Sequence, residues 1–261
     1  MKVTPPVVIS DIDGVLRDNK EPPSKELCEI IIRLCAPELH DIARGMLFFM
    51  ITGAPVAHLP SLPALLAFAE SGAVKRLGNG DYVVKGKGMN AIRTLRKLLR
   101  ITREDGLDEI EEGSIIIEEP RFCSLTLLFG QPPHYPDTKT TAPPSIVEER
   151  IRRLIAHAQL PLQVIPARSR TYAWLDIVAT TKAEVIKELL AQKEWMRAYY
   201  LGDGSNDLEV MRFPSIVPVG FRNSIEEIKE LARMRGIYID IPGPSGGALR
   251  FFEKLEQNEL G

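Results

Sequence analysis

The chain has 261 residues, 44% hydrophobic and 26% charged, which is enough to bury the core of one large domain or two modest ones. Its formal net charge of −2 argues against a nucleic-acid-binding surface and against disorder. Three scattered cysteines form neither a disulfide framework nor a zinc site, and no apolar run approaches the roughly 20 residues that cross a bilayer. We therefore expect a cytoplasmic protein, a monomer or homodimer, that binds neither nucleic acid nor membranes.

Short apolar runs alternate along the chain with segments whose apolar residues recur at helical spacing, a pattern typical of an α/β fold with a largely parallel sheet. Pro60 and Pro63 interrupt one of the helical segments. In the first third of the chain we expect strands at 7–10 and 46–51, a helix at 25–34 with Ser24 as its N-cap, an interrupted helix at 55–70, and a hairpin of strands 74–76 and 82–84.

The pattern changes between residues 86 and 179, where we expect an inserted α+β unit. It has predicted helices at 89–101 and 146–157, strands at 114–118, 122–129, 162–165 and 171–178, and a proline-rich loop at 130–144. The parallel pattern then resumes, with helices at 182–192, 205–212, 224–233 and 247–255 and strands at 198–201, 216–219 and 237–239. The sequence therefore predicts a core domain of residues 1–85 and 180–261 and an inserted domain of residues 86–179.

Two carboxylates, Asp11 and Asp13, follow the first predicted strand and precede Gly14. Ligands of open α/β sheets bind at the carboxyl ends of the strands. On an extended backbone, side chains two residues apart point the same way, so both carboxylates can reach one site. Taken alone, the pair also fits an Asx turn that caps the next element.

A second acidic motif, Gly202-Asp203-Gly204-Ser205-Asn206-Asp207, lies between the predicted strand 198–201 and the next helix. Asp203 ends the strand, and Asp207 lies four residues on, in the first helical turn. Several carboxylates without matching lysines suit a hard cation that binds through oxygen. A glycine-rich turn with a helix cap is the alternative interpretation.

Two further polar positions follow the same rule. Thr52-Gly53 ends the strand at 46–51, where a hydroxyl and backbone N–H groups can hold a phosphate oxygen, although this dipeptide is common. Lys182 lies in the first turn of a helix, where the helix dipole disfavours a cation unless it faces an anion or a carboxylate cluster. A solvated lysine is the alternative at that position.

The order of these motifs resembles that of the haloacid dehalogenase-like (HAD) hydrolase superfamily, and within it the IIB subfamily of sugar-phosphate, mannosyl-3-phosphoglycerate and sucrose phosphatases. Further segments are similar to that subfamily: Glu70-Ser71-Gly72-Ala73, Leu175-Asp176-Ile177 and the stretch 219–224. The resemblance covers both core portions, whereas the inserted unit matches in size and position only. It implies a three-layer α/β/α, Rossmann-like core with an α+β cap domain.

The resemblance also implies a chemistry. Asp11 would be the nucleophile that takes the phosphoryl group as an aspartyl-phosphate, and Asp13 the acid that protonates the leaving alcohol and then the base that activates water. Mg²⁺ would be bound by Asp11, the Asp13 carbonyl and Asp203, with Asp207 supporting it directly or through water. Mg²⁺ and a lysine would offset the repulsion between a phosphate dianion and an anionic nucleophile.

The phosphoryl oxygens would be held by Thr52 and the Gly53 backbone, while Lys182 would neutralise nucleophile and phosphate. Asn206 would assist the phosphate or Lys182. These roles describe a Mg²⁺-dependent phosphomonoesterase for a small phosphorylated metabolite, a sugar phosphate or a phosphoglycerate-type ester. The alternatives are a phosphomutase of the same superfamily, which is phosphomannomutase-like, and a non-catalytic phosphometabolite-binding protein.

The sequence departs from the subfamily in three ways: Ala54 stands where Arg often follows Thr-Gly, Ala183 stands where Gly often follows the lysine, and the spacing from Asp176 to Lys182 is shorter than expected. These departures weaken any transfer of substrate identity. The cap is expected to close over the site and to bind the leaving group. Arg168 and Arg170 are candidates to meet a second anionic group of the substrate, as are Arg121 and two aromatic residues of the cap.

Overall fold

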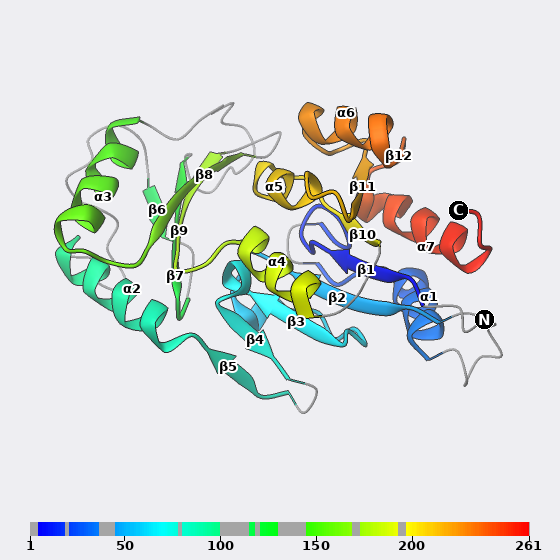
Figure 1. Ribbon diagram of the computed structural model, residues 1–261, viewed down its shortest axis with the longest axis horizontal. Coiled ribbons are helices and arrows are strands. Elements are labelled where there is room, and N and C mark those ends of the chain that lie inside the picture. Colours follow the sequence, from blue (N-terminus) through cyan, green and yellow to red (C-terminus); the bar gives the residue numbers. More distant parts are fainter. Residues whose placement is uncertain are drawn as a thin grey trace.

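The computed structural model of the chain describes residues 5–18, 21–36, 45–77, 80–99, 115–117, 121–129, 145–168, 173–192 and 197–260. Two sheets organise these residues, one of eight strands and one of four (Figure 1). The larger sheet is built from both ends of the chain and the smaller one from the middle. In the described ranges, no helix has the length and hydropathy that spanning a bilayer would require.

The large sheet has the order β12-β11-β10-β1-β2-β3-β4-β5. Its first six strands are parallel, and β4 and β5 form an antiparallel hairpin at one edge. The strands in chain order are β1 (Val7–Ser10), β2 (Leu47–Ile51), β3 (Leu66–Ala69), β4 (Val74–Arg76), β5 (Tyr82–Val84), β10 (Ala198–Leu201), β11 (Ile216–Phe221) and β12 (Ile237–Ile239). The central strand β1 therefore has one neighbour from each end of the chain.

Helices cover both faces of this sheet because its buried strands are apolar on both sides. In β1, Val8 packs into a core with α1 (Lys25–Cys35) and α7 (Ala248–Glu256). The alternate residues Val7 and Ile9 pack into a second core. That core contains α4 (Lys182–Gln192), α5 (Leu208–Met211) and α6 (Glu226–Arg235). The expected three-layer α/β/α architecture is confirmed.

The smaller sheet belongs to residues 86–179, which we call the cap segment. Its order is β6-β7-β9-β8, all antiparallel. The cap segment comprises α2 (Gly86–Leu98), β6 (Ile115–Ile117), β7 (Ser124–Phe129), α3 (Ser145–His157), β8 (Gln163–Arg168) and β9 (Ala173–Val178). Side chains of α2 and α3 pack against β7 and β9 in a third core, which lies apart from the large sheet (Figure 1).

The predicted helix at 55–70 is wrong. This stretch contains a short 3₁₀ turn, Val56–His58, and then β3, Leu66–Ala69, which pairs in parallel with β2. Pro60 and Pro63 cannot donate the backbone hydrogen bonds of a helix interior. The apolar run that follows them is instead buried as a sheet strand.

Most other boundaries differ by a few residues. The predicted cap of α1 is confirmed, since Ser24 Oγ accepts the Leu27 N–H at 3.2 Å. Helix α2 begins at Gly86 rather than Met89. The proline-rich loop expected at 130–144 lies outside the described residues.

Candidate active site

The site lies at the carboxyl ends of β1, β2 and β10. The register pairs Ser10 with Met50 of β2 and with Leu201 of β10, so the residues after these three strands lie side by side. The Asp11 N–H also donates to the Leu201 carbonyl at 2.9 Å. The strand order reverses direction between β1 and β10, and this switch point is where α/β proteins of this kind bind their ligands.

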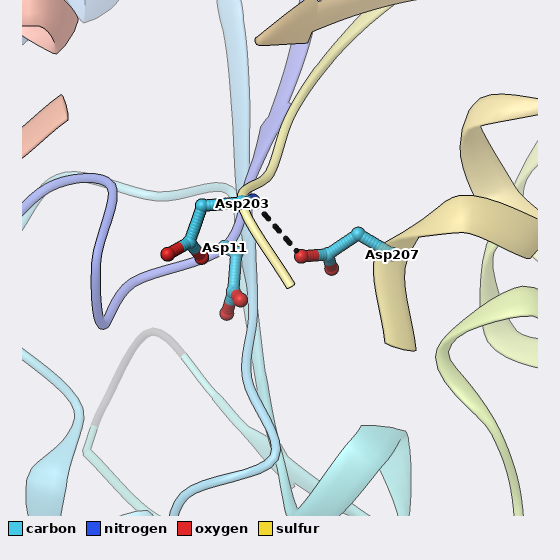
Figure 2. A group of neighbouring side chains, drawn as sticks. All are labelled: Asp11, Asp203 and Asp207. Carbon is cyan, nitrogen blue, oxygen red and sulfur yellow. Dashed lines mark hydrogen bonds between the residues drawn. The ribbon is translucent and has the colours of Figure 1, made fainter. Parts of the chain in front are cut away.

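Three acidic side chains converge at this switch point: Asp11, Asp203 and Asp207, here called the carboxylate group. One oxygen from each lies within 4.8 Å of the others. Figure 2 shows that Asp11 comes from the end of β1, while Asp203 and Asp207 come from the segment that follows β10. Asp207 ends a 3₁₀ turn, Ser205–Asp207, where the sequence predicts the first turn of a longer helix.

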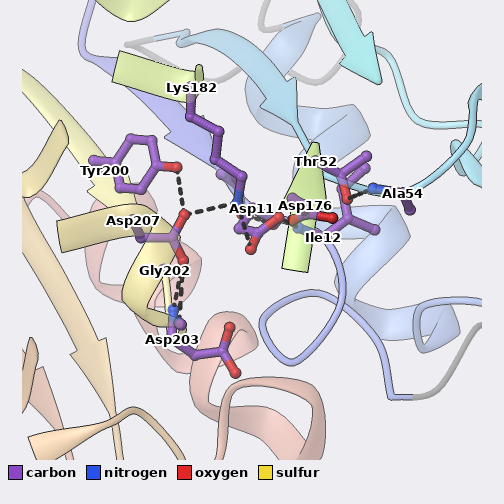
Figure 3. A network of polar contacts seen from close by, with 12 residues as sticks. Asp11, Ile12, Thr52, Ala54, Asp176, Lys182, Tyr200, Gly202, Asp203 and Asp207 are labelled. Atoms are coloured by element: carbon purple, nitrogen blue, oxygen red, sulfur yellow. Dashed lines mark hydrogen bonds and ion pairs between the residues drawn. The ribbon is translucent and has the colours of Figure 1, made fainter. Parts of the chain in front are cut away.

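Lys182 neutralises part of this charge. It starts α4 and is 2% exposed, and its Nζ lies 2.8 Å from Asp11 Oδ2 and 2.8 Å from Asp207 Oδ1 (Figure 3). Helix α4 is capped by Thr181, whose Oγ1 accepts the Glu184 N–H. The lysine in this first turn therefore faces the carboxylate group and not solvent.

Asp207 is held by four hydrogen-bond donors. Its Oδ1 accepts from the Tyr200 hydroxyl at 2.7 Å and from Lys182. Its Oδ2 accepts the backbone N–H groups of Asp203 at 3.2 Å and Gly204 at 3.1 Å. Both oxygens of Asp207 thus accept hydrogen bonds from the protein. Through them Asp207 links the Lys182 ammonium to the backbone of Asp203. Tyr200 carries no recognisable signal in the sequence.

The electrostatics of the site show an excess of negative charge. Burial raises the pKa of Asp11 to about 7, against the attraction of Lys182, and Asp207 adds to the rise. Burial and the two neighbouring carboxylates raise the pKa of Asp203 well above its usual value. Burial opposes the charge of Lys182, but Asp11 and Asp207 together raise its pKa. One ammonium neutralises the three carboxylates only in part, and carboxylate oxygens are ligands that fit a hard divalent cation.

Asp13 lies at the more open side of the site. Its carboxylate is 38% exposed and pairs with Arg17, whose Nε donates to Asp13 Oδ1 at 2.7 Å. Arg17 itself is buried. The guanidinium therefore holds one oxygen of Asp13 and fixes the direction of the side chain.

The turn after β1 allows the two acidic motifs to approach each other. Gly14 has φ +78°, and a Cβ on it would lie 2.2 Å from Asp203 Oδ2. Asn223 bridges the same segments, since its Nδ2 donates to the Gly14 carbonyl at 2.7 Å and to Asp203 Oδ2 at 3.3 Å. Its Oδ1 accepts the Gly243 N–H. The sequence motifs include Asn223 but do not indicate this bridging role.

Thr52 and Gly53 follow β2, next to Asp11. Thr52 is buried, and its Oγ1 accepts the Ala54 N–H at 3.0 Å. A Cβ placed on Gly53 would lie 3.9 Å from Asn206 Nδ2 and 3.6 Å from Asp176 Oδ2. The structure therefore brings Gly53 and Asn206 close together, and Figure 3 shows Thr52 on the same side of the site as Asp11 and Asp176.

The cap segment also reaches the site. Asp176 of β9 is buried and accepts hydrogen bonds from Trp174 Nε1 and Thr126 Oγ1. In the sequence, Asp176 is marked by being a carboxylate inside an otherwise apolar strand, and this is the signal that indicates a role in the site. Strand β8, which Arg168 ends, contacts the turn Ser205–Asp207. Arg170, the other predicted substrate residue, lies outside the described residues.

No protein-family model matches the sequence, and the comparison with curated proteins finds no match. The fold, however, is similar to those of several solved phosphatases. Sucrose-phosphatase from Synechocystis sp., solved with sucrose and phosphate, is 13% identical with a TM-score of 0.59, over 96% of this chain and 99% of that one. The C-terminal domain of trehalose-6-phosphate phosphatase from C. albicans is 14% identical with a TM-score of 0.62, over 97% and 92%.

A phosphatase of the HAD enzyme superfamily from Bacteroides thetaiotaomicron is 16% identical with a TM-score of 0.57, over 95% of each chain. These similarities extend over the core and the cap segment together. The chain therefore has the fold of the HAD phosphatases, with a Rossmann-like core.

Proposed function

We propose that the protein is a Mg²⁺-dependent phosphomonoesterase that hydrolyses a small phosphorylated metabolite through an aspartyl-phosphate. The observation that carries this proposal is the convergence of Asp11, Asp203 and Asp207, two of which form ion pairs with the buried Lys182. The fold of the HAD phosphatases supports it.

In the first half-reaction, an oxygen of Asp11 attacks phosphorus and the bond to the leaving alcohol oxygen breaks. Asp13 gives its proton to that oxygen. The Ile12 N–H donates to Asp11 Oδ1 at 2.8 Å and Lys182 contacts Oδ2, so the nucleophile has a defined orientation before substrate binds. Lys182 also offsets the repulsion between carboxylate and phosphoryl group.

In the second half-reaction, Asp13 accepts a proton from water, the water oxygen attacks phosphorus, and the bond to Asp11 breaks to release inorganic phosphate. The salt bridge with Arg17 keeps one oxygen of Asp13 occupied, which leaves the other for this proton transfer. Thr52 and the Gly53 backbone hold the phosphoryl oxygens, with Asn206 beside them.

Asp11, Asp203 and the Asp13 carbonyl would hold Mg²⁺, and Asp207 supports the ion by orienting its neighbours. When bound, the ion supplies positive charge to the phosphoryl oxygens. This role explains why the fold gathers carboxylates whose pKa values are raised in each other's presence.

The cap segment and the similar structures support a proposal for the substrate class. Phosphatases with this fold include sucrose-phosphatase and trehalose-6-phosphate phosphatase. We therefore propose a sugar phosphate or a phosphoglycerate-type ester, with Arg168 and Arg170 as candidates for its far end. The contact between β8 and the turn Ser205–Asp207 supports a position of Arg168 near the site.

Hydrolysis of p-nitrophenyl phosphate with Mg²⁺ tests the proposal. We expect release of inorganic phosphate that is abolished by EDTA and by Asp11→Asn, a variant that preserves side-chain shape. An exposed carboxylate such as Glu188→Gln is the matched control and should retain activity. Transfer that requires a bisphosphate and releases little phosphate would indicate a phosphomutase. Binding of phosphate esters without any turnover would refute an enzyme.

A further inference from the structure

We propose that Arg121, in the cap segment, is a positioning residue for the phosphate-binding loop of the core, residues 52–54. The inference rests on the proposed function, because only that function makes residues 52–54 a phosphate-binding loop. It assigns to the cap segment a part in phosphate binding, besides contact with the rest of the substrate.

The carbonyl groups of the loop are held from two directions. The Thr52 carbonyl accepts the Ser71 N–H at 2.9 Å, and the Ala54 carbonyl accepts the Glu70 N–H at 3.0 Å. Between them, the Gly53 carbonyl accepts a hydrogen bond from Arg121 Nη1. The core thus fixes the two outer carbonyls, and the cap segment fixes the central one.

Arg121 is itself anchored close to this loop. Glu70 is fully buried, and its carboxylate accepts the N–H groups of Phe122 at 2.8 Å and Cys123 at 2.7 Å and the Ser124 hydroxyl at 3.0 Å. Glu70 adopts φ +49°, a left-handed conformation that costs free energy for a residue with a Cβ. The contacts of its backbone and side chain join the loop to residues 122–124, which directly follow Arg121.

The effect on phosphate binding passes through Thr52. The bond from Arg121 fixes the plane of the Gly53–Ala54 peptide, whose N–H points to Thr52 Oγ1. Because that oxygen accepts the Ala54 N–H, the single hydroxyl proton of Thr52 is left to donate to a phosphoryl oxygen. The guanidinium also brings positive charge to a loop where Ala54 supplies none.

The test compares Arg121→Met and Arg121→Lys with wild type. Arg153→Met on the exposed face of α3 is the control. Binding of inorganic phosphate in the presence of Mg²⁺ is measured by calorimetry, and kcat and KM are measured with p-nitrophenyl phosphate. Loss of the loop geometry should weaken phosphate binding and lower kcat/KM by about 100-fold in Arg121→Met, with partial recovery in Arg121→Lys. Arg153→Met should match wild type.

A double-mutant cycle with Thr52→Val separates positioning from a general structural role. If Arg121 acts through Thr52, Arg121→Met should change phosphate affinity by less than about threefold in the Thr52→Val background. Equal effects in both backgrounds, or wild-type affinity in Arg121→Met, would overturn the inference. If the thermal transition shows that Arg121→Met is unfolded, the same cycle with Arg121→Lys decides.

The outcomes distinguish the inference from the proposed function. If the wild-type protein hydrolyses the ester and the Arg121 variants bind phosphate as tightly as wild type, the proposed function stands and the inference about Arg121 is refuted. If the wild-type protein shows no turnover but its phosphate affinity still depends on Arg121 through Thr52, the proposed function is refuted and the inference about Arg121 stands.

Discussion

Replacing Lys182 by Met is the most direct perturbation of the site. The variant keeps the length of the side chain and removes an ammonium that lies 2.8 Å from one oxygen of Asp11 and 2.8 Å from one oxygen of Asp207. All three side chains are at least nine-tenths buried. The change therefore leaves two carboxylates in a poorly solvated place without their cation.

Removing one partner of a buried ion pair costs about 3–5 kcal/mol, and we expect Lys182→Met to lose this amount of unfolding free energy at alkaline pH in EDTA. The loss should shrink in acid. The pKa of Asp11 is raised in the folded state from 3.8 to about 7. Its contribution to stability is therefore present below the unfolded pKa and is lost as pH rises through the folded one.

Without Lys182, whose attraction lowers the pKa of Asp11, that pKa rises further. The stability of the variant should then keep falling above neutral pH, by about 1.4 kcal/mol per pH unit for each extra proton bound in the folded state. The expected loss of kcat, from an electrostatic group at the reacting centre, is about 100- to 1000-fold.

Urea denaturation in EDTA, from acid to alkaline pH, measures the unfolding free energy of each variant. Lys187→Met, at an exposed position of the same helix, is the control. We expect the curves of wild type and control to coincide, and the curve of Lys182→Met to diverge downward as pH increases. A constant difference between Lys182→Met and wild type at all pH values would refute the coupling between the lysine and Asp11.

Three further predictions concern the same surroundings. Tyr200→Phe removes the donor to Asp207, and urea denaturation should show a loss of about 1.5–3 kcal/mol; wild-type stability would contradict the hydrogen bond. Because burial raises the pKa of Asp203 and raises that of Asp11 to about 7, calorimetric Mg²⁺ affinity should increase as pH rises through about 7. A pH-independent affinity would place the ion elsewhere. Gly72→Ala, at φ +99°, puts a Cβ 2.2 Å from Val185 Cγ2 and should cost about 2–4 kcal/mol, partly recovered by Val185→Ala; a stable Gly72→Ala would show that the turn adapts.

The parts of the fold that the sequence predicts well are those whose signals are local. The strand Val7–Ser10 and the helix Lys182–Gln192 have the predicted bounds. The first is a short apolar run before an acidic turn, and the second begins after a capping threonine. β3 was mispredicted because Leu66–Ala69 is rich in leucine and alanine, which favour helices. Its partner β2 lies outside the local pattern and determines its conformation.

The same distinction applies to the site. Asp11, Lys182 and Asp203 each follow a strand or begin a helix, so a strand-end rule finds them and the sheet brings them together. Arg121 and Glu70 contact residues of another segment, and neither lies in a pattern that indicates its partner. Tyr200 occupies an ordinary buried strand position. Only the three-dimensional arrangement relates such residues to the site.

The pairing of β1 with β10 has a consequence for biosynthesis. A growing chain on the ribosome can place β2 beside β1 early, because the two strands are close in sequence. β10 is made only after the whole cap segment, so the edge of β1 that pairs with β10 waits for its partner strand during most of translation. Chains that end before this strand lack Asp203 and Asp207 and cannot assemble the carboxylate group, so the proposed hydrolysis would begin only once the carboxyl-terminal strands have emerged.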